Sequence, residues 1–294
     1  MKKTLGDYIV LLIGIIGSFA STIAFGVYIA PELDSQGWVG VAFLGILTLF
    51  FLGYNFYLIA KYRKKVRYSE IFDEVNIGFA ELHKIDRTEK PSMELIIQKM
   101  GFLCDSLASA FTKINGHNIG ICIKYLTFEN KRPLVQTLVR DRSSKTNDRK
   151  TGKSDGIKHY LDLNSDFDFI YSNFDNDNID TTYYYEPKLP ICNDYKNTRL
   201  KNNWLTKTKI PFTENILRRS SWPLKYRSTM VVPIVPILAD DQNQKSIRGF
   251  LCIDSPFEKS FNKHIDVSVL KGVCDGLYNK IDILNSLIKE QHEA

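Results

Sequence analysis

Two long apolar runs, separated by a short polar loop, open the chain. They cover Tyr8–Ala30 and Val39–Ala60, and neither contains a charged residue. Each is about as long as the roughly 20 residues that a helix needs to cross a bilayer. The pattern predicts a two-helix transmembrane hairpin over residues 1–60. A cleaved signal peptide is the alternative for the first run, but Ser18-Phe19-Ala20 is a poor cleavage site and the apolar run continues past it.

The charges that flank these runs predict their orientation. Lys2 and Lys3 precede the first run, and the segment Lys61–Arg67 after the second run is strongly basic. The loop between the runs contains Glu32 and Asp34 and no base. Because Lys and Arg in short flanks stay in the cytoplasm, we expect a multi-pass membrane protein with both termini in the cytoplasm.

Small and weakly polar residues lie within both runs. Gly14, Ser18 and Thr22 recur at a spacing that permits close helix packing in lipid, either within the hairpin or in a homo-oligomer. The sequence leaves both arrangements open, as it does the choice between a pore and a simple anchor. If several hairpins assembled into a pore, the candidates for its wet face would be Ser18, Ser21, Thr22, Thr48 and Asn55.

A basic juxtamembrane and connector segment at residues 61–91 comes next, in which Ser69–Ile85 has helical spacing. A second helix is expected after Ser92, which can cap it, and before Asn115-Gly116, which has turn chemistry. Its core-facing residues would be Leu95, Ile96, Met100, Leu103, Leu107 and Phe111.

Strand patterns dominate the remainder of residues 92–294. Alternating β-branched and apolar residues predict strands at Asn118–Thr127, Leu134–Arg140, Thr229–Leu238 and Ser246–Asp254, and helical spacing predicts a last helix at His264–Lys289. Pro233 and Pro236 would place the third strand at an edge or a bulge, since proline cannot donate to a ladder. The order predicts a cytosolic α+β domain with an antiparallel sheet and flanking helices.

The side chains that usually carry catalysis or bind metals are scattered. Five cysteines form no CxxC pair, and Cys104, Cys122 and Cys252 lie in apolar settings typical of buried thiols. The histidines have no paired-ligand spacing, and Asp175–Asp180 lacks two features of a calcium loop. We find no nucleophile elbow, P-loop or dinucleotide fingerprint. The chain is therefore predicted not to be an enzyme, with no catalytic residues, no metal and no cofactor.

One part of the chain resembles a known family. The residues from Tyr226 to Ile234, followed by Gly249-Phe250-Leu251-Cys252-Ile253-Asp254-Ser255, are similar to the end of a GAF domain. Phe261 and the last helix match its continuation. The resemblance implies a sensor domain for small molecules or proteins, often dimeric through terminal helices. It departs from chromophore-binding and cyclic-nucleotide-binding members, because no Cys-His pair is present and Asn262-Lys263 follows Phe261.

A basic, aromatic segment lies in the part of the chain that would house the GAF ligand pocket. Bases that neutralise phosphates and aromatic rings that stack on bases predict contact with a nucleic acid or nucleotide. The alternative is a solvated loop that pairs with the acidic stretch Asp162–Asp180 or lies on anionic lipid. The candidate residues are Lys196, Arg199, Lys201, Trp204, Lys207, Lys209, Arg218, Arg219, Trp222, Lys225 and Arg227.

The plan of the chain, a membrane hairpin with a cytosolic sensor, resembles the membrane effectors of antiphage defence systems, including retron-associated transmembrane proteins and nucleotide-signalled effectors. This resemblance implies an effector of abortive infection that lies in a bacterial inner membrane and disrupts that membrane. Its GAF-like domain would be held or triggered by a reverse transcriptase–RNA/DNA complex or a signalling nucleotide. The alternative is a membrane-anchored receptor for a small ligand without toxic activity.

Overall fold

The computed structural model describes residues 35–144, 159–174, 182–192, 194–200, 211–236 and 247–293, together with Gly17, Ser21, Ala24 and Tyr28. The chain divides into two compact units, Met1–Tyr68 and Ser69–Ala294. The first predicted span, Tyr8–Ala30, lies outside the described residues except for those four, which are helical.

Helix α2 (Ser35–Leu82) contains the second predicted span and continues for 48 residues. Within the described part of the chain, Trp38–Ile59 is the one stretch long and apolar enough to cross a membrane, with a mean hydropathy of 1.9 and none of it buried. We expected a separate connector helix from Ser69, but the helix runs on without a break. The reason is local, because residues 60–69 contain neither Gly nor Pro and are rich in Lys and Arg, which favour helix.

The second unit begins with the last turns of α2, which pack on helix α3 (Met93–Asn115). A Cβ atom at Gly78 would lie 2.7 Å from Cδ1 of Leu103, so glycine permits the close approach of the two helices. Glu81 pairs with Lys99 at 2.6 Å across the same contact. The last turns of α2 therefore lie directly against α3.

Both predicted ends of α3 are confirmed. The Oγ of Ser92 accepts a hydrogen bond from the Leu95 amide at 3.2 Å, and Gly116 ends the helix with a φ of 75°. The predicted core residues of α3 are buried apart from Leu95, which is half-buried.

A six-stranded antiparallel sheet forms the centre of the unit. Its strands are β1 (Gly120–Glu129), β2 (Arg132–Arg140), β3 (His159–Tyr160), β4 (Tyr184–Glu186), β5 (Ser228–Ile234) and β6 (Gly249–Ser255), in the order β3-β2-β1-β6-β5-β4. The four predicted strands are thus β1, β2, β5 and β6. Strands β3 and β4 have too few residues for a sequence pattern to indicate them.

Strand β5 is not an edge strand, contrary to the expectation from its prolines. It pairs with β6 over its whole length and with β4 only at Thr229–Val231. Pro233 lies beyond the end of β4, so its missing N–H costs no ladder bond to that strand. Because β4 is short, Pro233 has no partner on that side, as it would at the edge of a sheet.

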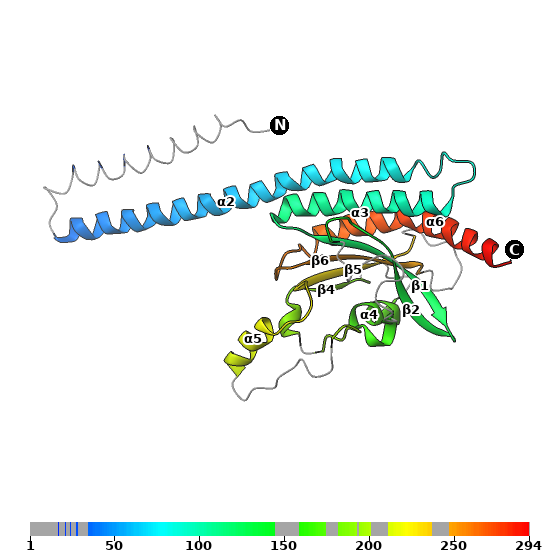
Figure 1. Cartoon of the computed structure of the whole chain (residues 1–294). Helices are drawn as coiled ribbons and strands as arrows, with labels where there is room; N and C mark the ends of the chain where they lie inside the picture. The colour runs from blue at the N-terminus through cyan, green and yellow to red at the C-terminus, as the bar shows by residue number, and fades with distance from the viewer. Residues whose placement is uncertain are drawn as a thin grey trace. The chain divides into compact units, whose positions relative to one another are not determined.

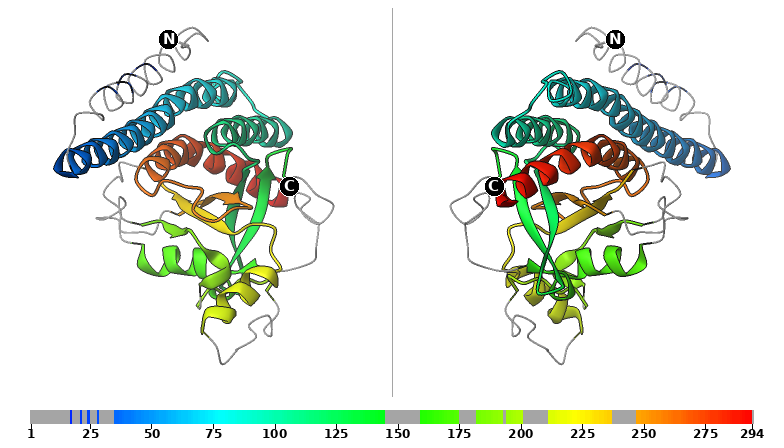
Figure 2. Two further views of the ribbon diagram at one scale, coloured as in Figure 1. Left: turned by 90° about the vertical axis from the view of Figure 1, so that its left-hand side faces the viewer. Right: turned by 90° about the vertical axis from the view of Figure 1, so that its right-hand side faces the viewer.

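Helices cover both faces of the sheet (Figures 1 and 2). Helices α3 and α6 (Ile265–Glu293) lie on one face, and α4 (Ser165–Asn173) lies on the other. Short 3-10 turns at Leu161–Leu163 and Leu189–Ile191 and helix α5 (Pro211–Ser220) complete the described elements. We call the side of the sheet beneath α4 the α4 face.

Candidate functional site

The α4 face has an apolar core that charged side chains interrupt. Phe167 and Ile170 of α4 pack there against Cys122, Phe250 and Cys252 of the sheet. Alternation along β1 and β6 therefore places two charged residues, Lys124 and Asp254, on the same face.

A bulge in β2 brings a third charge to this face. The register pairs Lys124 with Thr137 but Ile123 with Val139, so one additional residue of β2 stands between these pairs. Without the bulge, alternation from Thr137 would point Val139 toward α4 and the next residue away. With it, Val139 lies against Gly101 of α3, and Arg140, opposite Cys122, points to the α4 face.

Arg140 is buried in this position without hydrogen bonds from two of its nitrogens. Its side chain is 8% exposed, and neither Nε nor Nη1 has a hydrogen-bond partner within the described ranges. Burial lowers the pKa of Arg140, but nearby Cys122, Asp254 and Asp141 more than offset this, so its pKa is raised and the guanidinium is charged. A buried charge with unpaired donors is costly, and its presence needs an explanation.

The two neighbouring carboxylates are engaged elsewhere. Asp141 accepts hydrogen bonds from the Ile121 amide and the Ser144 amide, each at 2.7 Å, and thereby closes the turn after β2. Asp254 accepts from Oγ1 of Thr229 at 2.8 Å. Among the described residues, none forms an ion pair with Arg140.

Lys124 of β1 and Asp166 of α4 interact electrostatically. The Nζ of Lys124 donates to Thr137 at 3.4 Å and lies 5.4 Å from the centroid of the Phe167 ring. Burial raises the pKa of Asp166 to about 7, against the opposing effects of Lys124 and of a hydrogen bond from the Phe167 amide. Asp166 therefore changes its charge near neutral pH.

Cys122 and Cys252 are directly opposite each other on β1 and β6, and both are buried free thiols. The hydrogen bond from Cys252 lowers the pKa of Cys122, with Arg140 and Lys124 acting in the same direction. Burial raises the pKa of Cys252. The prediction that Cys104, Cys122 and Cys252 are buried is confirmed.

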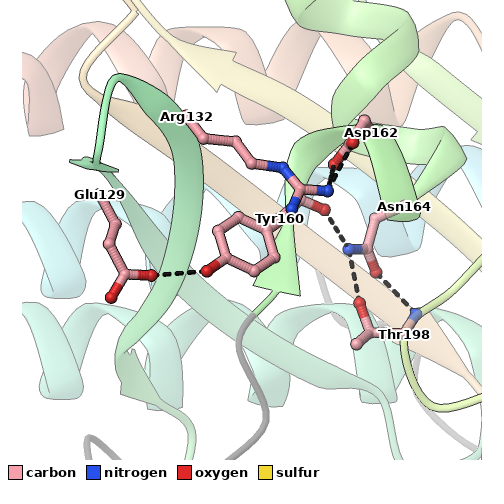
Figure 3. A network of polar contacts seen from close by, with 6 residues as sticks. All are labelled: Glu129, Arg132, Tyr160, Asp162, Asn164 and Thr198. Carbon is pink, nitrogen blue, oxygen red and sulfur yellow. Dashed lines mark hydrogen bonds and ion pairs between the residues drawn. The ribbon is translucent and has the colours of Figure 1, made fainter.

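A polar network fastens the segment that begins at Asp194 to the start of α4 (Figure 3). Asn164 donates to the Tyr160 carbonyl and to Oγ1 of Thr198, each at 2.7 Å, and its Oδ1 accepts from the Thr198 amide at 3.1 Å. The hydroxyl of Tyr160 donates to Glu129 at 2.5 Å. Since Asp166 lies two residues beyond Asn164, this network fixes the part of α4 that faces the charged groups.

Some residues of the predicted basic, aromatic segment participate in the fold. Trp222 is 9% exposed, packs with Leu189 and Tyr195, and donates from its indole nitrogen to the Tyr226 carbonyl at 2.6 Å. It would have to leave this cluster in order to stack on a base. Arg219 holds Glu258 with two hydrogen bonds, at 2.7 and 2.9 Å.

The other described bases of the segment differ in exposure. Arg218 is buried within 3.9 Å of Glu214, and Arg227 donates to the Arg219 carbonyl at 3.2 Å. Lys196 and Lys225 are exposed and Arg199 is half-buried. Outside the described residues lie Lys201, Trp204, Lys207 and Lys209. Contact with a nucleic acid or nucleotide stays a prediction.

The candidates for a wet face of the membrane segment are partly described. Ser21 is helical and exposed. Thr48 and Asn55 are half-buried in α2, and the Asn55 side chain donates to the Phe51 carbonyl at 2.8 Å. Ser18 and Thr22 lie outside the described residues, as do residues 175–180 of the acidic stretch. Across the ranges that the structure describes, no three His, Cys, Asp or Glu side chains gather as metal ligands would.

Sequence reasoning did not single out Lys124, Arg140, Asp166 and Asp254 as a site. A signal was present for two of them, since Lys124 and Asp254 share the face of apolar residues in otherwise hydrophobic strands. For Arg140 no such signal exists, because strict alternation places it on the opposite face and only the bulge reverses this.

Comparisons with known proteins give similarity at the level of overall arrangement. The sequence matches no protein-family model and no curated protein. Among solved structures, the chain is similar to a type II free methionine-R-sulfoxide reductase from Thermoplasma acidophilum, with 14% identity over 64% of this chain and 94% of that chain and a TM-score of 0.37.

Two further solved structures are similar in the same degree. The GAF domain of a phosphoenolpyruvate-protein phosphotransferase from Acinetobacter is 13% identical over 66% of this chain and 92% of that one, with a TM-score of 0.36. The chromophore-binding domain of a bacteriophytochrome from R. palustris is 12% identical over 74% and 63%, with a TM-score of 0.38. The structural neighbours thus include GAF domains. The antiparallel sheet with helices on both faces is an α+β arrangement, as the sequence predicted.

Proposed function

We propose that the chain is a membrane-anchored receptor whose GAF-like domain binds a small polar molecule at the α4 face. The observation that carries this proposal is the buried guanidinium of Arg140, which has two nitrogens without partners. Binding sites combine apolar walls with a few polar groups that fix the ligand, and the α4 face has this composition. The proposal assigns the domain a binding role rather than a catalytic one.

A packed route from the α4 face to α2 supports a signalling role. Val139, next to Arg140, contacts α3, where a Cβ at Gly101 would lie 3.3 Å from Cγ2 of Val139. Farther along α3, Leu103 lies against Gly78 of α2. Because α2 is one continuous helix that includes Trp38–Ile59, a shift of α3 on ligand binding would be passed to the apolar stretch.

The proposed anchor is the two-span hairpin with both termini in the cytoplasm. Reporter fusions at the C-terminus test this orientation. Activity from a C-terminal reporter of the kind that works only in the periplasm would contradict it. For the coupling, we would measure hydrogen exchange of the full chain in nanodiscs with and without a protein-free small-molecule filtrate of cell lysate. We expect slower exchange in α4 and in Ser69–Leu82, and a change in exchange in residues 38–59 to which the continuous helix passes the shift.

A helix-breaking variant separates binding from coupling. Lys64→Pro interrupts α2 between the apolar stretch and the domain, since proline removes a helical hydrogen bond and clashes with the preceding turn. Protection of α4 should then persist while any ligand effect on residues 38–59 is lost. If the filtrate changes exchange in neither region of the unaltered chain, the receptor function is wrong.

The second candidate function is the abortive-infection effector, in which release of the domain lets the apolar segments disrupt the membrane. It is favoured by the charge-free stretch Trp38–Ile59 and by the basic, aromatic segment that starts beside α4. The test is to express the chain alone and with its genomic neighbours, challenge the cells with phage, and follow membrane potential. Normal growth with intact polarisation in every case would end this hypothesis.

A further inference from the structure

We infer that Arg140 anchors an oxyanion, a carboxylate or phosphate group of the small molecule that the domain binds. This inference rests on the receptor function proposed above and names the chemistry of its ligand. It depends on the placement of one side chain rather than on the GAF-like fold, since the bulge at Leu138 is what turns Arg140 to the α4 face.

The guanidinium is available for an anion. Guanidinium groups bind carboxylate and phosphate with charge-assisted hydrogen bonds, and each unpaired buried donor raises the free energy of the unliganded fold. Arg140 has such donors at Nε and Nη1 while its side chain is more than nine-tenths buried. An oxyanion would satisfy the donors and neutralise the charge at once.

The neighbouring carboxylates of Asp141 and Asp254 do not already satisfy the donors of Arg140. Oδ2 of Asp141 accepts from Oγ of Ser143 at 2.7 Å in addition to the amide of Ser144, so its oxygens are held by the turn. Asp254 is held by Thr229 across β5 and β6. Both carboxylates lower the electrostatic cost of burying Arg140, but neither forms an ion pair with it.

A second cation favours an anion on this face. Lys124 lies on the α4 face of β1, and among the described residues its Nζ donates to the neutral hydroxyl of Thr137. Asp166 loses much of its negative charge at and below neutral pH, because burial raises its pKa. The α4 face then has two cations, Arg140 and Lys124, and one further carboxylate, Asp254, which Thr229 holds.

The test measures the thermal midpoint of the full chain in nanodiscs with sodium acetate, sodium phosphate or sodium sulfate, with sodium chloride keeping ionic strength constant. We expect acetate or phosphate to raise Tm of the unaltered chain by about 3 °C at tenfold excess over the dissociation constant. The rise should be absent in Arg140→Met and in Arg140→Gln.

Arg142→Gln is the matched control. Arg142 lies two residues along the chain, pairs with Asp105 at 3.0 Å, and has a side chain that is 81% exposed. Its loss changes the net charge equally, so the anion-dependent rise should persist in this variant. Arg140→Met should fold, since an unpaired buried charge is replaced by an apolar side chain of similar length.

The outcomes separate this inference from the receptor function. A rise in Tm that survives in both Arg140 variants, or no rise with any of the three anions, overturns the oxyanion site. If the anions have no effect but the small-molecule filtrate raises Tm, the receptor function stands and its ligand has another chemistry. If acetate raises Tm and phosphate does not, the site takes a carboxylate; the reverse result assigns a phosphate.

Discussion

Asn164 and Thr198 hydrogen-bond to each other twice, through Nδ2 to Oγ1 at 2.7 Å and through the Thr198 amide to Oδ1 at 3.1 Å (Figure 3). This reciprocal pair joins two segments that are 34 residues apart in the sequence. Asn164 is almost fully buried, at 1% exposure, and Thr198 is half-buried, so both bonds are partly shielded from water. The pair therefore holds the start of the basic, aromatic segment against α4.

Replacing Asn164 with Ala should release that segment. The change leaves the Thr198 amide without its partner, and an unsatisfied buried donor costs about 1–3 kcal/mol. We expect faster tryptic cleavage at Lys196 and Arg199, followed by mass spectrometry of the fragments. Asn173→Ala is the matched control, since Asn173 makes the same bond to a carbonyl four residues earlier on the exposed side of α4. Equal cleavage of both variants would contradict this role.

Asp166 should make the domain less stable as pH rises. Burial raises its folded pKa to about 7, above the unfolded value near 3.9, so the folded state binds the proton more tightly. Its stabilising contribution is complete below about pH 4 and is lost as pH rises through about 7. Asp166→Asn should therefore raise the free energy of unfolding above pH 7, by roughly 1.4 kcal/mol for each pKa unit of the shift, and change little near pH 4.

Denaturant unfolding across this pH range measures the effect. Asp168→Asn serves as the control, because Asp168 also lies in the first turn of α4 but is only half-buried. A pH profile of Asp166→Asn that is parallel to that of the unaltered chain would show that Asp166 does not titrate as described.

Cysteine reactivity should follow burial. Cys104 and Cys274 are buried and burial raises the pKa of both, so neither should react with a thiol reagent until the domain unfolds. Cys192 is only partly exposed and its pKa is also raised, but a reagent can reach it, and it should react first. Timed alkylation with peptide mapping gives the order. Labelling of Cys274 before Cys192 in the folded chain would contradict the packing of α6.

Gly249 should not tolerate a side chain. A Cβ there would lie 2.2 Å from the backbone oxygen of Lys124, and β1 can relieve this contact only by moving. We expect Gly249→Ala to destabilise the domain by about 1–3 kcal/mol, measured by chemical unfolding. Gly272→Ala in α6 meets no atom within 4 Å and should be neutral or stabilising, since alanine favours helix. Similar losses in both variants would argue against the close approach.

The sequence predicted the helices and long strands because their signals are local. The apolar periodicity of α3, its Ser92 cap and its Gly116 end act within a few residues. The runs of β-branched and apolar residues in β1, β2, β5 and β6 are local signals too, and every residue of β5 is buried. Strands β3 and β4, by contrast, are too short for alternation and exist because longer strands pair with them. The sequence does not indicate the continuity of α2, because basic residues after an apolar run are typical of the end of a membrane span.

The sequence by itself determined the apolar N-terminal half of α2, the antiparallel α+β domain and the buried thiols, since hydrophobic spacing specifies which residues avoid water. Tertiary structure decided where the charges meet. One additional residue in β2 reverses the side of Arg140, and register between β1 and β6 brings it near Asp254. The sequence gives the identity and charge of each side chain, but the face of the sheet on which the side chain lies depends on pairing between distant strands.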